Sequence, residues 1–186
     1  TFPNVNETTI LSNRFFDGTD CLDTEIKLFD EDSPSFTMAV DYEFLSTTGS
    51  NGALVACYER NGAEGFHLIY SGASASNTVE WGDKTVSVGY GCNRNMVVFR
   101  HKKGSSSLYV YSFNNSGDVY QNTLNTSQAV RTTSPDSEQI LCFGADPILT
   151  GGHRNYAIGW IHWCKIWYDD LGVNVASKLA SWTGET

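Results

Sequence analysis

Short apolar runs bounded by turn-forming residues recur along almost the whole chain of 186 residues. In the clearest run, 36–44, alternate residues such as Phe36, Met38 and Val40 lie on one face, which is the pattern of a half-buried strand. Roughly ten to twelve such runs, spaced by about 8 to 15 residues, predict an all-β, antiparallel sandwich or barrel. The other runs lie at 53–58, 65–70, 78–81, 85–90, 96–100, 107–113, 118–123, 139–143 and 156–168.

One segment departs from this pattern. Val175, Leu179 and Trp182 are spaced as on one face of a helix, so residues 173–182 are predicted to form a short C-terminal helix. The polar stretch 125–136 has the weakest signal for ordered structure. No internal repeat or long linker interrupts the chain. We therefore expect a single domain over residues 1–186, excised from a longer chain.

Charge and hydropathy exclude two classes of partner. The formal net charge is −9, with only 12 Lys and Arg residues, which argues against nucleic-acid binding because an acidic protein repels phosphates. The longest apolar run, 53–57, is far shorter than the ~20 residues of a membrane-spanning helix. Neither nucleic acid nor membrane insertion is expected.

The 5 cysteines lie far apart, with no CxxC pair. Their spacing predicts neither a disulfide framework nor a zinc site. Cys57 and Cys164 fall inside apolar strand patterns, where a free cysteine behaves as a small hydrophobic residue. Free thiols indicate folding in a reducing compartment.

Near the start of the chain, Phe15-Phe16-Asp17-Gly18 is followed by Leu22-Asp23-Thr24 and by the strand at 36–40. This order resembles the opening of the laminin-G-like, concanavalin A-type jelly-roll family. Near the end, 159–171 resembles its closing strand, with Cys164 where the family usually has Val and Trp167 where it has Tyr. The continuation through 171–182 is similar to bacteriophage tail and structural proteins that carry this module. The resemblance implies a jelly-roll sandwich with a ligand site on the concave sheet or on the loops at one rim, within a virion.

The closing strand also carries a prediction of its own. Ile161, Cys164 and Ile166 cannot share one face under strict alternation. One extra residue near His162 and Trp163 restores the common face, so we expect a β-bulge there.

Catalytic motifs are missing from the sequence. Glycosidases with this fold carry an E-x-D-x-E type strand that places an acid and a nucleophile about 5 Å apart, and no such triplet occurs here. The chain also lacks G-x-S-x-G, HExxH and P-loop motifs. We therefore predict no catalytic residues and no enzymatic activity.

Calcium is the accessory ion that the family resemblance implies. Asp17, Asp20 and Asp23 near the opening turn, and Asp146 near a chain reversal, offer carboxylate oxygens of the kind that calcium prefers. Their spacing matches no known ligand pattern. The expectation is no obligatory cofactor and no metal ligands, with turn-forming acids favoured over bound calcium.

Aromatic residues beside polar ones mark the candidate ligand site. Sugars stack their C–H faces on aromatic rings, and their hydroxyls need polar partners. The stretch at 151–156 combines two glycines with four such side chains, and Trp160 extends it along the closing strand; Trp81 with Asp83 is a second patch. A structural turn remains the alternative for this loop, and packing in the core for Trp81. The predicted ligand-binding residues are His153, Arg154, Asn155, Tyr156, Trp160, Trp81 and Asp83.

These observations favour a non-catalytic recognition module on a bacteriophage tail fibre, spike or appendage tip that binds host cell-surface carbohydrate. Its expected location is the virion, after folding in the host cytoplasm. Its other partners would be virion subunits, with a homo-oligomer formed through the parent chain as a further option. Two alternatives stay open: a structural or assembly module that binds no sugar, and a glycan depolymerase with an unrecognised carboxylate pair.

Overall fold

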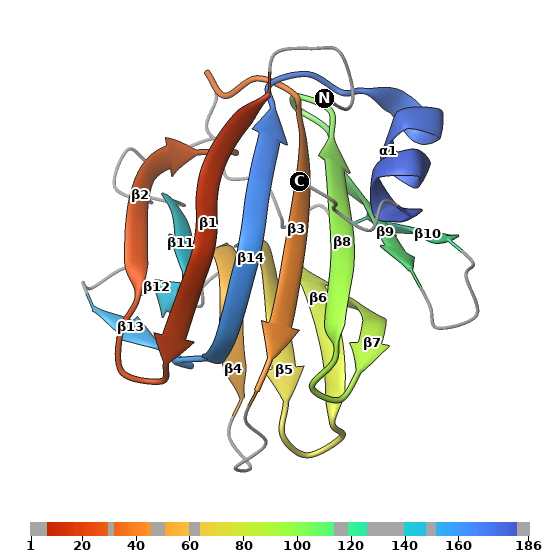
Figure 1. Ribbon diagram of the computed structural model, residues 1–186. Helices are drawn as coiled ribbons and strands as arrows, with labels where there is room; N and C mark the ends of the chain where they lie inside the picture. The colour runs from red at the N-terminus through yellow and green to blue at the C-terminus, as the bar shows by residue number, and fades with distance from the viewer. Residues whose placement is uncertain are drawn as a thin grey trace.

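The computed structural model describes residues 7–29, 32–45, 51–59, 64–113, 119–125, 140–147 and 152–181. Over these residues the chain forms two six-stranded sheets packed face to face, with a two-stranded ribbon and a short helix (Figure 1). Sheet A has the order β1 (Thr8–Asp17), β14 (Ile158–Trp167), β3 (Phe36–Phe44), β8 (Arg94–His101), β9 (Ser107–Phe113), β10 (Val119–Asn125). Sheet B has the order β2 (Leu22–Lys27), β11 (Ile140–Phe143), β4 (Gly52–Glu59), β5 (Glu64–Ser71), β6 (Ser76–Trp81), β7 (Lys84–Tyr90).

All strands within the two sheets pair antiparallel, and strands distant in sequence are neighbours. The C-terminal β14 lies between β1 and β3, and β11 lies between β2 and β4. The predicted fold class, an antiparallel β-sandwich with a short C-terminal helix, is confirmed. The predicted runs at 36–44 and 107–113 coincide with β3 and β9. Periodicity missed β1, because most of its residues are exposed and its apolar alternation is weak.

The main core lies between the two sheets and contains one residue that was predicted to contact a ligand. Phe16, Phe36 and Tyr42 from sheet A pack there with Phe66 and Trp81 from sheet B. The Trp81 side chain is 0% exposed, and its indole N–H donates to the carbonyl oxygen of Ser106 at 2.9 Å. The assignment of Trp81 to a ligand site is therefore wrong: its alternation places it on the inner face of β6, where a large ring fills the core.

The β-bulge predicted in the closing strand is present. The register of β14 against β3 shifts between Ile161 and Trp163, and Ile161, Cys164 and Ile166 all lie in the core between the sheets. The extra residue restores one apolar face, as the spacing requires. Cys57 and Cys164 are fully buried, as predicted, and all five cysteines are free.

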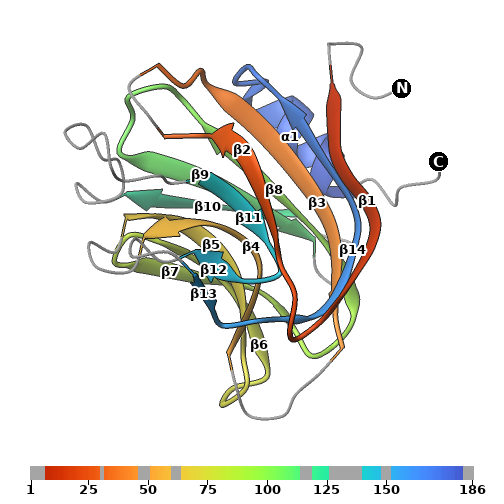
Figure 2. The same cartoon turned by 90° about the vertical axis from the view of Figure 1, so that its left-hand side faces the viewer.

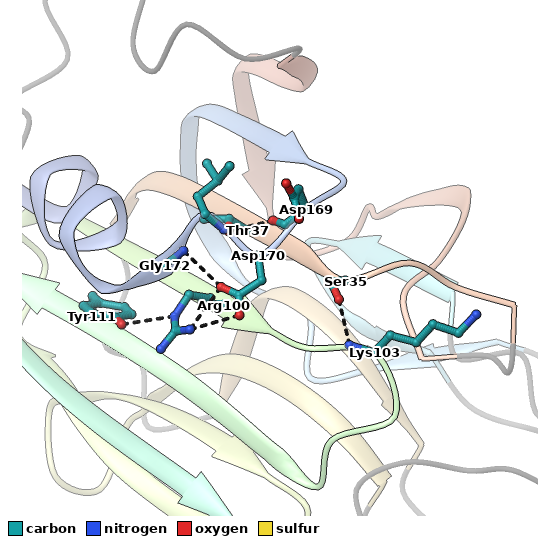
Figure 3. A network of polar contacts seen from close by, with 9 residues as sticks. Ser35, Thr37, Arg100, Lys103, Tyr111, Asp169, Asp170 and Gly172 are labelled. Carbon is teal, nitrogen blue, oxygen red and sulfur yellow. Dashed lines mark hydrogen bonds and ion pairs between the residues drawn. The ribbon is translucent and has the colours of Figure 1, made fainter.

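Helix α1 (Gly172–Ser181) covers part of the outer face of sheet A (Figures 1 and 2). A polar network fixes the start of the helix, as Figure 3 shows. Asp170 accepts the backbone N–H of Gly172 at 3.1 Å and two hydrogen bonds from the guanidinium of Arg100 at 3.0 Å each. The hydroxyl of Thr37 donates to the carbonyl of Asp169 and accepts from the N–H of Leu171. These contacts join β3 and β8 to the helix N-terminus.

The helix begins one residue before the predicted segment, and Trp182 lies outside the described residues. Residues 126–136 of the predicted polar stretch also lie outside them. No helix in the described part of the chain has the length and apolar character to cross a membrane.

Candidate functional site

A row of side chains crosses the outer face of sheet B, the face turned away from the core. The strand registers pair Asp23 with Cys142, Cys142 with Ala56, Ala56 with His67, and His67 with Glu80. Directly paired residues of antiparallel strands point to the same face. Since Phe66, Leu68 and other alternate residues of these strands fill the core, the row points outward.

His67 in β5 is the centre of this row. Its Nδ1 lies 2.8 Å from Oδ1 of Asp146, and its Nε2 lies 2.6 Å from Oε2 of Glu80. Burial alone would lower the pKa of His67, but the two carboxylates outweigh it and raise that pKa to about 9. At neutral pH the imidazole is therefore a cation that donates to both carboxylates.

Asp146 connects this buried cation to a small β-ribbon, β12 (Asp146–Pro147) paired with β13 (His153–Arg154). The ribbon lies next to β4 and β11 on the sheet B side of the molecule (Figure 2). The second carboxylate oxygen of Asp146 accepts the side-chain amide of Asn155 at 2.8 Å. Asn155 has a left-handed backbone, with φ of 52°, and its carbonyl accepts the N–H of Ala53 at 2.8 Å. Asn is one of the few non-glycine residues that adopt this conformation readily.

The four predicted ligand-binding residues at 153–156 thus lie together at this ribbon. Their side chains are less exposed than those of a loop that projects into solvent. Tyr156 is 36% exposed, whereas His153, Arg154 and Asn155 are partly buried. The Nε of Arg154 is buried and has no hydrogen-bond partner among the described residues. We use the name ribbon site for Arg154, Asn155 and Tyr156 together with the hydrogen-bonded residues Asp146, His67 and Glu80.

His153 contacts both Tyr156 and the start of β2: its ring centroid lies 6.4 Å from that of Tyr156. Its Nε2 lies 2.7 Å from Oδ1 of Asp23. Beside it are Cys21 and Cys142, and one ligand atom from each of Cys21, Cys142 and His153 lies within 4.8 Å of the other two. The structure therefore joins two thiols and an imidazole that the sequence spacing had given no reason to connect.

The two remaining predicted ligand residues do not belong to the ribbon site. Trp160 lies on the outer face of sheet A, where its ring contacts Phe15 at 5.1 Å and stacks on His162 at 6.0 Å between ring centroids. The prediction that Trp160 extends the 153–156 platform is wrong, because adjacent Ile161 takes the core face and turns Trp160 the other way. Asp83 lies in the β6–β7 turn, is half exposed and pairs with Lys84 at 3.0 Å.

The acidic residues considered for calcium all have protein donors in this structure. Asp17 accepts both the N–H and the hydroxyl of Thr19, and Asp20 pairs with Arg14 at 2.6 Å. Asp23 is hydrogen-bonded to His153, and Asp146 is hydrogen-bonded to His67 and Asn155. A calcium ion would have to displace these donors. The expectation that turn-forming acids are favoured over bound calcium stays a prediction.

Sequence reasoning missed His67 and Glu80 as site residues. Both fall within ordinary strand patterns, and the contact of His67 with Asp146 spans 79 residues. The only signal in the sequence was that His67 alternates with apolar residues of β5, which places its side chain on the face away from the core. That signal suggests a polar partner but cannot identify it.

The likeness of this chain to known proteins lies in its fold. No protein-family model matches the chain, and no curated protein matches it. The CBM40 domain of Ruminococcus gnavus IT-sialidase, solved with α2,3-sialyllactose, is similar over 94% of this chain and 97% of its own, at a TM-score of 0.57 and 13% identity.

Two larger proteins are similar over part of their length. NanB sialidase from Streptococcus pneumoniae matches 93% of this chain with 27% of its own, at a TM-score of 0.60 and 12% identity. The binding domain of botulinum neurotoxin DC, solved with rat synaptotagmin II, matches 96% of this chain with 47% of its own, at a TM-score of 0.54 and 9% identity. At these identities the likeness shows a shared β-sandwich fold alone.

Proposed function

We propose that this chain is a non-catalytic carbohydrate-binding module whose ligand meets the ribbon site. The observation that carries the proposal is Arg154, whose buried Nε lacks a hydrogen-bond partner among the described residues, beside the exposed ring of Tyr156. A buried N–H without an acceptor costs free energy, and a hydroxyl or carboxylate of a sugar would supply that acceptor. The ring of Tyr156 would supply a stacking surface.

Rigidity of the site supports the same proposal. The charged His67 holds Asp146, Asp146 holds Asn155, and the backbone of Asn155 is bonded to β4. The residues on either side of Asn155 are thus held in place before a ligand arrives. A site ordered in advance loses less conformational entropy on binding.

The contacts of the carboxylates argue against a depolymerase at this site. Asp146 and Glu80 both hydrogen-bond the same imidazole of His67, so each is engaged with a cation and neither is placed as a free acid or nucleophile. One similar protein, the CBM40 domain of Ruminococcus gnavus IT-sialidase, was solved as an isolated domain, and this too favours binding over catalysis.

The function is tested by measuring binding of the purified chain to sialyllactose, neutral oligosaccharides, cell-wall glycans and intact cells. Sialyllactose is the first probe because two of the neighbours were solved with it. We expect the double variant Arg154→Ala/Tyr156→Ala to bind the recognised glycan at least about tenfold more weakly, with an unchanged thermal midpoint.

The matched control is Lys103→Ala/Tyr168→Ala. It removes an exposed cation from the β8–β9 connection and an exposed ring from the residue that follows β14, whereas Arg154 and Tyr156 precede β14. This variant should bind like the parent. A parent chain that binds no glycan, or a double variant that binds as well as the parent, would contradict the proposal.

A second candidate function, assembly without sugar, is favoured by one surface. On the outer face of sheet A, Phe15 is 39% exposed and packs on Trp160, next to His162, which is bonded to Glu43 at 3.0 Å. Exposed clustered aromatic side chains are typical of protein interfaces. Association of the purified chain that is lost in Phe15→Ser would support a homo-oligomer or subunit contact at this face.

We also propose a bacteriophage virion as the setting, with folding in the host cytoplasm and other virion subunits as neighbours. The support is the similarity of residues 171–182 to phage tail and structural proteins, together with the free thiols. Mass spectrometry of purified particles would test it, and absence of the parent protein from them would contradict it.

A further inference from the structure

We infer that Cys21, Cys142 and His153 form a zinc-binding site, with Asp23 as the carboxylate that orients the histidine. The three ligand atoms come from the segment before β2, from β11 and from β13, and they lie within 4.8 Å of one another. Two thiolates and one imidazole are a ligand set that selects zinc among the common divalent ions, with a water molecule completing the tetrahedron.

The geometry requires little rearrangement. Ligand atoms of a tetrahedral zinc site with sulfur and nitrogen donors lie about 3.5 Å apart. Cys142 and Asp23 are directly paired across β11 and β2, and Cys21 immediately precedes β2. Sheet hydrogen bonds therefore hold Cys142 and Asp23 in fixed relation. Cys21 and His153 lie outside these two strands.

Asp23 lies 2.7 Å from Nε2 of His153. Nδ1 is therefore the ring nitrogen that would bind zinc, and the Asp23 carboxylate on the other nitrogen would fix the orientation of the ring. The strand register places Cys142 directly opposite Asp23, so the same carboxylate lies beside one of the two thiols.

The consequence of this site is a bond between sheet B and the ribbon. His153 is adjacent to Arg154, and its zinc bond would fix the ribbon from the side opposite to the Asp146–Asn155 contact. That zinc would stabilise a glycan site at Arg154 rests on the proposed function, whereas zinc binding itself does not. The metal titration described next contains no sugar, so it succeeds or fails independently of glycan binding.

The experiment uses the full chain, reduced and freed of metal by a chelator, and titrated with Zn²⁺ alone by calorimetry. We expect one equivalent to bind, and Co²⁺ to give the intense absorption of a tetrahedral thiolate site. Cys21→Ser, Cys142→Ser and His153→Gln should each abolish stoichiometric binding. Asp23→Asn should weaken it by about 10- to 100-fold.

Cys92→Ser is the matched control, because Cys92 is also a partly buried free cysteine and belongs to no cluster of metal-ligating groups among the described residues. It should bind zinc like the parent. Circular dichroism must first show the parent β-spectrum for each variant, so that a loss of binding is not a loss of folding. Failure of the reduced parent to bind zinc would overturn the site. So would equal loss of binding in Cys92→Ser, or a Cys21–Cys142 disulfide that forms in air and survives in the presence of zinc.

Discussion

At the scale of single residues, the most consequential side chain is His67, because a buried cation is stable only while both of its carboxylate partners are in place. Its pKa is about 9 in the folded chain and near 6.5 in an unfolded one. The folded state therefore binds this proton more tightly, and the stabilisation is complete below pH 6.5 and lost as pH rises through 9. We expect the free energy of unfolding in urea to fall by up to about 3 kcal/mol across that interval.

The variant His67→Gln provides the comparison for this pH dependence. Gln keeps a hydrogen-bonding side chain but does not titrate, so its unfolding free energy should change much less between pH 6.5 and pH 9. A parent and variant with parallel pH profiles would show that His67 is not charged in the folded chain.

At the scale of elements, helix α1 depends on Asp170 for its attachment to sheet A. Asp170 caps the helix and neutralises Arg100, whose side chain is largely buried (Figure 3). Asp170→Ala removes the cap and leaves a largely buried guanidinium without its carboxylate partner, so we expect about 2 to 4 kcal/mol of destabilisation in urea unfolding. The adjacent, exposed Asp169→Ala is the control, with an expected effect within about 0.5 kcal/mol. Equal effects of the two substitutions would contradict this account.

At the scale of the whole molecule, the two hydrophobic clusters share sheet A. Trp81 belongs to the cluster between the sheets and Trp167 to the cluster beneath α1, and strands β3, β8 and β14 contribute side chains to both. We expect far-ultraviolet circular dichroism and tryptophan fluorescence to give coincident urea transitions, as for one cooperative domain. Two separated transitions would indicate that the helix-covered face unfolds independently.

The sequence alone was sufficient for the features that depend on local periodicity. The alternation in β3 and β9, the bulge in β14, the burial of Cys57 and Cys164, and the C-terminal helix each follow from residues a few positions apart. Such patterns are readable because the side-chain periods of strands and helices are fixed by backbone geometry. The polar and aromatic composition of 153–156 likewise indicates a candidate site at the ribbon.

Tertiary structure decided which of these residues form a site. His67 meets Asp146 across 79 positions, His153 meets Asp23 across 130, and Trp81 is in the core while Trp160 lies on the other sheet. These contacts depend on the order of strands in the sheets, where β11 lies between β2 and β4. Strand order is set by burying apolar faces over the whole domain, and no short stretch of sequence records which strands become neighbours. The composition of the site could therefore be predicted in part, whereas its connections required the fold.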